Sequence, residues 1–182
     1  MEISLIRHGE AAATWSESAD PGLSHLGQQQ AEDAAEALQP YADGDTLLFS
    51  SPLQRALETS VPLARLLHTD VIVEDVFREI PSPVPLAERQ VWLRQFMQQH
   101  WVGQGDELIA WRAAALQRLL ALTQPAVIFT HFLLINAVVG ELLDRPETLC
   151  CWPANGSITR LRHNGTSLEL IALGDQIQTT VN

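Results

Sequence analysis

Lysine is absent from this 182-residue sequence, and all 11 of its basic residues are arginines. The 22 acidic residues outnumber them two to one, which gives a formal net charge of −11 at pH 7. Such an acidic chain is a poor partner for nucleic acid or for an anionic membrane surface, because like charges repel. If the chain handles an anion, its few arginines must therefore gather at one place.

Cysteine and long apolar runs are also scarce. The two cysteines, Cys150 and Cys151, are neighbours, and a disulfide between adjacent residues would be strained. No apolar stretch approaches the roughly 20 residues that cross a bilayer, and the first residues carry neither a basic leader nor a long apolar segment. These features favour a protein of the reducing cytoplasm, with inert thiols and no membrane contact.

The remaining composition is that of one globular domain, with 46% hydrophobic and 18% charged residues and a length that can bury a core. Short apolar runs alternate with helical patterns, which is typical of an α/β fold with a largely parallel sheet. The expected elements are strands at 2–6, 46–49, 71–73 and 126–129, helices at 24–38, 51–67, 86–101, 106–122 and 132–143, and a closing hairpin of 157–162 and 167–172.

The second of these helices has a well-marked start in the sequence Ser51-Pro52-Leu53-Gln54. Serine suits the N-cap, proline the first helical position, and Gln54 completes a capping-box pattern. This start predicts that Arg55 lies in the first turn of the helix.

Polar residues follow each of the four expected parallel strands. Arg7 and His8 follow the first, Arg55 the second, Glu79 the third and His131 the fourth. In open α/β sheets, ligands bind beyond the carboxyl ends of the strands. We therefore expect these five side chains to meet at one edge of the sheet.

The residue types at this edge suit phosphate chemistry. Arginine offers a planar fork of donors that stays charged, so Arg7 and Arg55 can bind phosphate oxygens. The helix after His131 would direct the N–H groups of its first turn towards the same anion. A neutral histidine such as His8 can attack phosphorus while its other nitrogen is held by a hydrogen bond. Gly9 would let the backbone approach a ligand closely.

A carboxyl group could complete the chemistry by protonating the leaving oxygen and then accepting a proton from water. Glu79 is the preferred candidate. Glu74 and Asp75 lie nearby in the sequence and remain alternatives.

Taken in order, these motifs resemble the histidine phosphatase superfamily, which includes the cofactor-dependent phosphoglycerate mutases. The first block is Leu5-Ile6-Arg7-His8-Gly9-Glu10, and the others are residues 20–31, 50–59, 77–80 and 130–137. The resemblance implies a phosphoglycerate mutase-like three-layer sandwich, with a mainly parallel central sheet flanked by helices. It also implies a single domain over residues 1–182, with a helical flap at about 81–122.

The resemblance further assigns roles to five residues. It makes His8 the residue that becomes phosphorylated, Glu79 the proton donor, and Arg7, Arg55 and His131 the phosphate ligands, with His131 also counted as catalytic. The implied substrate is a small-molecule phosphate ester, and no metal or organic cofactor is implied. The sequence does not indicate an oligomeric state.

Three departures from the family pattern bear on the substrate. Ala11-Ala12-Ala13 stands where many relatives carry Thr or Ser, Pro81-Ser82-Pro83 replaces an element common in the mutases, and Phe132 replaces a common glycine. They favour a phosphomonoester hydrolase over a mutase-like phosphotransferase. A protein phosphohistidine phosphatase and a non-catalytic phosphate-binding module also remain as alternatives.

Other conspicuous residues have ordinary structural interpretations. The remaining histidines lack ligand spacing and are expected at the surface or at helix ends; they are His25, His68, His100 and His163. Flap tryptophans are expected to be buried, although one could line the substrate entrance; they are Trp92, Trp101 and Trp111. Asn155-Gly156-Ser157 predicts a turn that could also reach the phosphate site, and Arg89 and Arg94 could meet a second anionic group.

Overall fold

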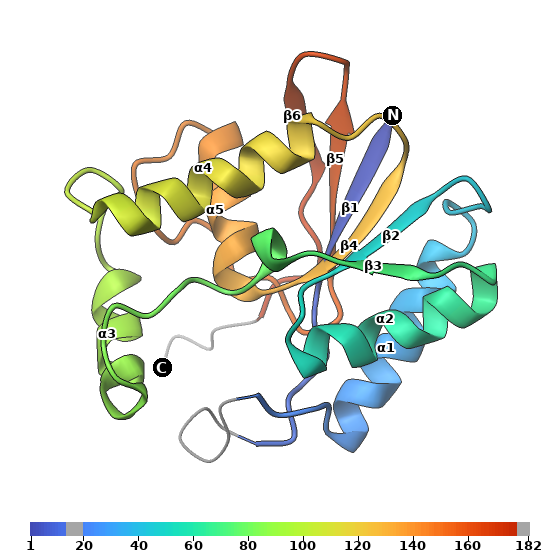
Figure 1. Cartoon of the computed structure of the whole chain (residues 1–182), viewed down its shortest axis with the longest axis horizontal. Helices are drawn as coiled ribbons and strands as arrows, with labels where there is room; N and C mark the ends of the chain where they lie inside the picture. Colours follow the sequence, from blue (N-terminus) through green and yellow to red (C-terminus); the bar gives the residue numbers. More distant parts are fainter. Residues whose placement is uncertain (14–19, 178–182) are drawn as a thin grey trace.

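The computed structural model describes residues 1–13 and 20–177. A six-stranded sheet in the order β3-β2-β4-β1-β5-β6 runs through the molecule (Figure 1). The strands are β1 (Glu2–Arg7), β2 (Leu47–Ser50), β3 (Val71–Val73), β4 (Ala126–Thr130), β5 (Ile158–His163) and β6 (Leu168–Ala172). The helices are α1 (His25–Leu38), α2 (Gln54–Leu67), α3 (Arg89–Phe96), α4 (Asp106–Leu120) and α5 (Phe132–Leu142), with 3-10 turns η1 (Asp75–Phe77) and η2 (Leu86–Glu88).

The pairing of the strands confirms the predicted mainly parallel sheet and the closing hairpin. β1, β2, β3 and β4 pair in parallel, whereas β5 and β6 are antiparallel. Arg7 lies opposite Thr130, and Ser50 lies opposite Phe129. The carboxyl ends of β1, β2 and β4 therefore finish almost level, so the residues that follow them meet.

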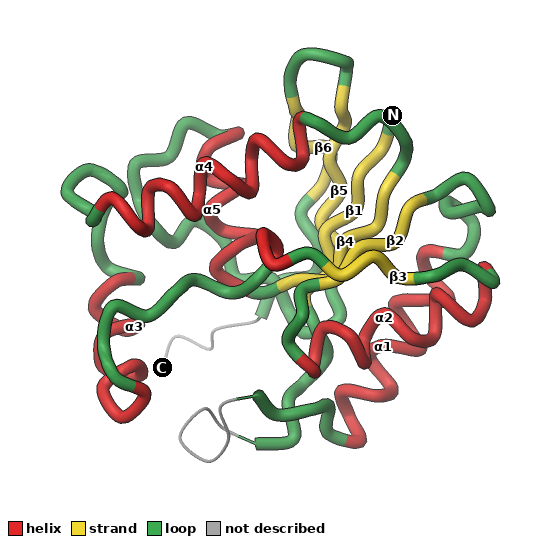
Figure 2. Tube along the Cα trace, viewed as in Figure 1, coloured by secondary structure: helices red, strands yellow, loops and turns green. Residues whose placement is uncertain are grey.

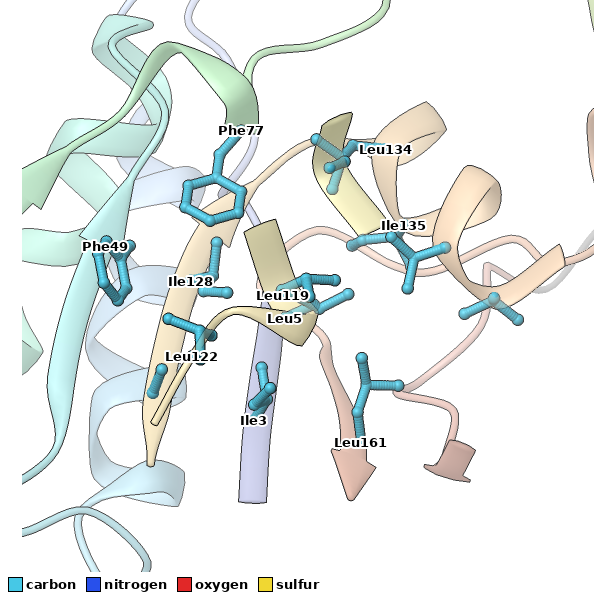
Figure 3. Close-up of a cluster of buried hydrophobic side chains, with 14 of the residues drawn as sticks. Ile3, Leu5, Phe49, Phe77, Leu119, Leu122, Ile128, Leu134, Ile135 and Leu161 are labelled. Atoms are coloured by element: carbon cyan, nitrogen blue, oxygen red, sulfur yellow. The ribbon is translucent and has the colours of Figure 1, made fainter. Parts of the chain in front are cut away.

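Helices cover both faces of the sheet, as the prediction of a three-layer sandwich requires (Figure 2). Successive strand side chains point to opposite faces: Leu5 packs in the cluster shared with α4 and α5, while Ile6 packs against α1 and α2. Figure 3 shows the first cluster, where Leu5 and Ile128 of the sheet meet Leu119 of α4 and Ile135 of α5. Burial of these side chains stabilises the layers.

The segment between η1 and β4 carries η2, α3 and α4 and packs a third apolar cluster against α5. The predicted helix over 86–101 is wrong in its extent, because it divides into η2 and α3 and stops at Phe96. Trp101 lies in the turn beyond it and is buried against Phe96. The helical flap at about 81–122 stays a prediction. So does the single domain over 1–182, which includes residues 14–19 and 178–182 outside the described part.

Two further predictions about single residues are wrong. α2 begins at Gln54 with Leu53 as its N-cap and no side-chain cap. The Ser51 hydroxyl accepts the N–H of Leu53 at 3.3 Å, before the helix begins, and lies 2.8 Å from His131 Nε2. His163 is only 5% exposed rather than at the surface, because β5 places it beside α4, where its Nε2 lies 3.0 Å from the Leu120 carbonyl oxygen. Within residues 1–13 and 20–177, no helix combines the length and the apolar character that a membrane span needs.

Candidate active site

The structure brings together the five residues predicted to form the site. Arg7 ends β1 and His8 follows it, Arg55 is the second residue of α2, and His131 is the N-cap of α5. The Arg55 Nε atom lies 3.0 Å from His8 Nε2, and its Nη2 lies 3.3 Å from His131 Nδ1. Glu79 follows η1 and lies near Arg55 and Arg7, whose pKa values are lowered by burial and partly restored by the charge of Glu79.

His8 is held with one ring nitrogen unprotonated. Its Nδ1 lies 2.7 Å from the carbonyl oxygen of Gly9, which can only accept, so Nδ1 carries the hydrogen. Its Nε2 accepts the Nε–H of Arg55. Burial, followed by the charge of Arg55, lowers the pKa of His8 to about 3. His8 is therefore a neutral imidazole with its lone pair on Nε2, which is the form that a nucleophile needs.

Protonation of His8 should make stability fall at acid pH. Its pKa of about 3 lies below the ordinary value of 6.5, so the unfolded chain binds this proton first as the pH falls. The stability is therefore fully present above about pH 6.5 and is lost towards pH 3. The H8N variant should reduce the slope of unfolding free energy against pH by up to about 1.4 kcal/mol per pH unit. Urea unfolding of both proteins between pH 4 and 8 measures this, and equal slopes would contradict it.

His131 is fully buried and is also neutral. Its Nδ1 accepts from Arg55, so its Nε2–H donates to the Ser51 hydroxyl at 2.8 Å. Burial and the neighbouring His8 and Arg55 keep the pKa of His131 well below its usual range. The two imidazole rings lie edge to face with centroids 5.2 Å apart, so both flank the same guanidinium group.

The Arg7 guanidinium group contacts a carbonyl oxygen and an aromatic ring. Its Nη1 donates to the Pro153 carbonyl oxygen at 2.8 Å, and its guanidinium carbon lies 5.0 Å from the centre of the Phe132 ring. Its Nε is buried and has no hydrogen-bond partner among the described residues. Burial lowers the pKa of Arg7 to about 10, which leaves it charged at neutral pH. A buried N–H in this condition suits an oxygen anion.

Glu79 is 7% exposed, and burial raises the pKa of its carboxyl group despite the Ile80 N–H and the nearby arginines. Its Oε1 accepts N–H groups from Ile80 and Leu133, each at 3.1 Å. Leu133 lies in the first turn of α5, whose N–H groups were predicted to point to a bound phosphate. The Leu133 N–H points instead to the carboxyl group of Glu79. Oε2 makes only a longer 3.4 Å contact with Leu133 and can carry the proton.

The two alternative carboxylates differ in their surroundings. Both oxygens of Glu74 accept from Arg118, at 2.7 and 2.8 Å, and this pair occupies the carboxylate. Asp75 is exposed and pairs with Arg78 at 2.9 Å. Geometry therefore leaves Asp75 as the one alternative to Glu79 among the candidates that the sequence suggested.

Three supporting residues were not assigned to the site from the sequence. Ser51 was interpreted as a helix cap, but binds His131. Thr59 accepts the N–H of Gly9 at 3.0 Å, and Asn155 donates to the carbonyl oxygen of His8 at 3.0 Å. Ser51 and Thr59 lie within the block 50–59, so the motif itself was the available signal, whereas the contact of Asn155 spans 147 residues of sequence.

The packing of the backbone requires glycine at position 9, while the predicted close approach to a ligand stays a prediction. A Cβ atom on Gly9 would overlap the carbonyl oxygen of Gly27, and a Cβ atom on Gly27 would overlap that of Glu10. The close approach is therefore between two backbone segments, which lets α1 pack under the loop that carries His8.

A pocket of about 530 Å³ opens over Arg55 and Glu79. Its other lining residues are Leu53, Asp75, Arg78, Ile80, Pro81, Leu86, Arg89, Glu107, Ala110, Trp111 and Ala114. Of the candidates in the flap, Arg89 and Trp111 lie in its wall, while Arg94 is exposed elsewhere. The described residues contain no group of three or more His, Cys, Asp or Glu side chains that could hold a metal ion.

Known proteins are similar to this chain over much of its length. The family description "Histidine phosphatase superfamily (branch 1)" matches residues 3–176. A probable phosphoglycerate mutase of Proteus mirabilis is 26% identical over 167 residues, which cover 80% of this chain and 76% of that protein. A bifunctional protein of Mycobacterium tuberculosis is 40% identical over 75 residues, or 39% of this chain; the match spans only 20% of that relative's length.

Solved structures show the same fold. A protein described as mycobacterial hydrolase 1 superposes with a TM-score of 0.72 at 25% identity, over 97% of this chain and 99% of the other. A phosphoserine phosphatase of Entamoeba histolytica, in complex with 3-phosphoglyceric acid, gives 0.71 at 22% identity, over 96% and 97%. A mycobacterial glucosyl-3-phosphoglycerate phosphatase gives 0.70 at 23% identity, over 96% and 99%. Because the family description matches residues 3–176, nearly the whole sequence, the chain belongs to the histidine phosphatase superfamily.

Proposed function

We propose that this protein hydrolyses a phosphomonoester through a phosphohistidine intermediate at His8. The observation that carries the proposal is the state of His8: neutral, with its unprotonated Nε2 beside the guanidinium of Arg55. A buried Glu79 with a raised pKa lies near the same guanidinium and supplies an acid. The nucleophile, the cation and the acid of a phosphoryl transfer thus occupy one site.

Substrate binding would redirect the hydrogen bonds of Arg55. A phosphate dianion attracts the Arg55 Nε–H more strongly than a neutral imidazole does, since charge-assisted hydrogen bonds are the stronger ones. The Nε2 lone pair of His8 is then released beside the phosphorus atom. The buried Nε–H of Arg7 binds a further phosphate oxygen. His131 binds one when it takes up a proton at Nδ1, the nitrogen that faces Arg55.

The reaction then takes two balanced steps. In the first, a bond forms between His8 Nε2 and phosphorus, the ester P–O bond breaks, and Glu79 gives its proton to the leaving oxygen. In the second, Glu79 as a carboxylate accepts a proton from water, the water oxygen bonds to phosphorus, and the N–P bond breaks. Inorganic phosphate leaves, and both His8 and Glu79 return to their starting protonation states.

The size of the pocket favours a metabolite as substrate. A volume of about 530 Å³ lies within the range of small-molecule sites, and its lining mixes arginines and carboxylates with apolar side chains. The solved relatives include two phosphatases of small phosphate esters. Phosphotransfer remains the second candidate, because a probable phosphoglycerate mutase matches 80% of the chain.

Trapping of the intermediate tests the proposal. The wild-type protein is incubated with a panel of phosphate esters, quenched in alkali and digested, and mass spectrometry should locate an acid-labile phosphoryl group on His8. Release of inorganic phosphate indicates a hydrolase, and an isomerised ester indicates a mutase. If no ester is consumed and no phosphoryl group is trapped, the enzymatic interpretation is wrong and a phosphate-binding module is left.

A further inference from the structure

An aromatic ring lies against one of the two active-site arginines. Phe132 is the first residue of α5, directly after His131, and its ring centre lies 5.0 Å from the guanidinium carbon of Arg7. On its other side it contacts the ring of Trp152, with centroids 5.6 Å apart. Glycine is common at this position in the family, so the phenylalanine ring distinguishes this chain from many relatives.

The loop that follows α5 fixes Arg7 from a second direction. The Arg7 backbone N–H donates to Ser157 at 3.1 Å, and its carbonyl oxygen accepts from Gly156 at 2.9 Å. The side-chain Nη1 donates to Pro153 in the same loop at 2.8 Å. These bonds set the position of Arg7 and of one end of its guanidinium group, but they do not set the rotation of the guanidinium plane.

Phe132 supplies the missing restraint. A guanidinium group over an aromatic face is attracted by the negative charge of that face, and the attraction grows when water is excluded. With Nη1 bound to Pro153 and the plane held by the ring, the buried Nε–H of Arg7 is left for an oxygen anion. Arginine binds phosphate best through two N–H groups of one plane, so the orientation of that plane decides the affinity.

We propose that Phe132 is a positioning residue, whose ring orients the Arg7 guanidinium for phosphate. The proposal rests on the proposed function only in that phosphate binds at Arg7, and it needs no turnover. Phe132 acts through Arg7 and is not assigned any contact with the reacting atoms.

Titration of inorganic phosphate by calorimetry tests the proposal directly. F132L keeps an apolar side chain but removes the aromatic face, and it should weaken phosphate binding roughly 3- to 30-fold, the range expected for a cation–π contact. F132Y keeps the face and should restore binding to within about twofold. Trp92→Leu is the matched control, because Trp92 packs in the same apolar cluster against Phe96. It should lower the melting temperature without weakening phosphate binding.

A double-mutant cycle with Arg7 separates positioning from a general effect. R7K keeps the charge but removes the planar fork, so F132L added to R7K should change the dissociation constant by less than about twofold. A full F132L effect in the R7K background would overturn the proposal, as would equal losses in F132L and F132Y. If F132L does not fold, F132M replaces it. If R7K binds phosphate too weakly to titrate, the comparison of F132L with F132Y decides the question. If the protein binds phosphate but hydrolyses no ester, the proposed function is refuted, whereas the double-mutant cycle still tests the role of Phe132.

Discussion

Replacing His8 with alanine is expected to lower kcat/KM for a phosphate ester by about 10⁴-fold or more, the scale of loss seen when a covalent nucleophile is removed. The reason is geometric. Nε2 of His8 is the unprotonated ring nitrogen that faces the Arg55 guanidinium, and its lone pair is prepared by the hydrogen bond from Nδ1–H to Gly9. Steady-state release of inorganic phosphate from the best substrate of the panel measures the loss.

His163 provides a matched control for this experiment. It is also a buried histidine, but it lies at the far end of β5, where its backbone N–H donates to Met1. His163→Ala should reduce stability and leave kcat/KM per folded molecule within about twofold of the wild type. If H8A loses less than about tenfold, or if H163A loses as much as H8A, the assigned nucleophile is wrong.

Substitution of Glu79 by glutamine should separate two kinds of substrate. Hydrolysis of alkyl phosphates is expected to fall by about 10²- to 10⁴-fold, the usual contribution of a general acid. Activated aryl phosphates should lose less than about tenfold, because their leaving oxygen needs no proton. The wild-type activity on alkyl esters should also fall as the pH rises through the raised pKa of Glu79, since only the protonated carboxyl group can donate.

The neighbouring carboxylates serve as controls for Glu79. Glu74→Gln breaks a pair with Arg118 outside the pocket lining and should affect stability more than the choice of leaving group. Asp75→Asn changes a pocket residue that is paired with Arg78 and should alter KM more than kcat. If E79Q loses equal activity on both ester classes, Glu79 is not the general acid. If the loss in D75N depends on the leaving group, Asp75 is the general acid.

Much of the fold could be predicted because its signals are local. Alternating apolar runs and helical spacing are written in short windows of sequence, and the order of strands and helices is confirmed with small shifts at their ends. The predicted start of α2 was wrong for a physical reason. Ser51 has the sequence pattern of an N-cap, but its hydroxyl reaches only the Leu53 N–H, before the helix begins, and also binds His131, which lies 80 residues away in the sequence. A contact of that range leaves no trace in the window around the helix start.

The gathering of the candidate residues was also predictable, but their surroundings were not. Strand ends that finish level at one edge bring Arg7, Arg55 and His131 together, and this follows from the parallel topology. The sequence did not indicate that the Leu133 N–H turns to Glu79, or that the loop at 153–157 holds Arg7. Those contacts depend on how α5 and the last loop pack against β1.

The sequence by itself determined which chemical groups this protein has and in which order the chain presents them. His8, Arg55, Glu79 and His131 belong to motifs that are local and specific, so their identity needed no structure. Only the tertiary structure decided the state of these groups. Packing excludes water from His8 and Glu79, which lowers the pKa of one and raises that of the other. Residues distant in the sequence place Arg55 against His8 and Pro153 against Arg7. Burial and distant partners are properties of the folded chain, because neighbours in the sequence do not supply them.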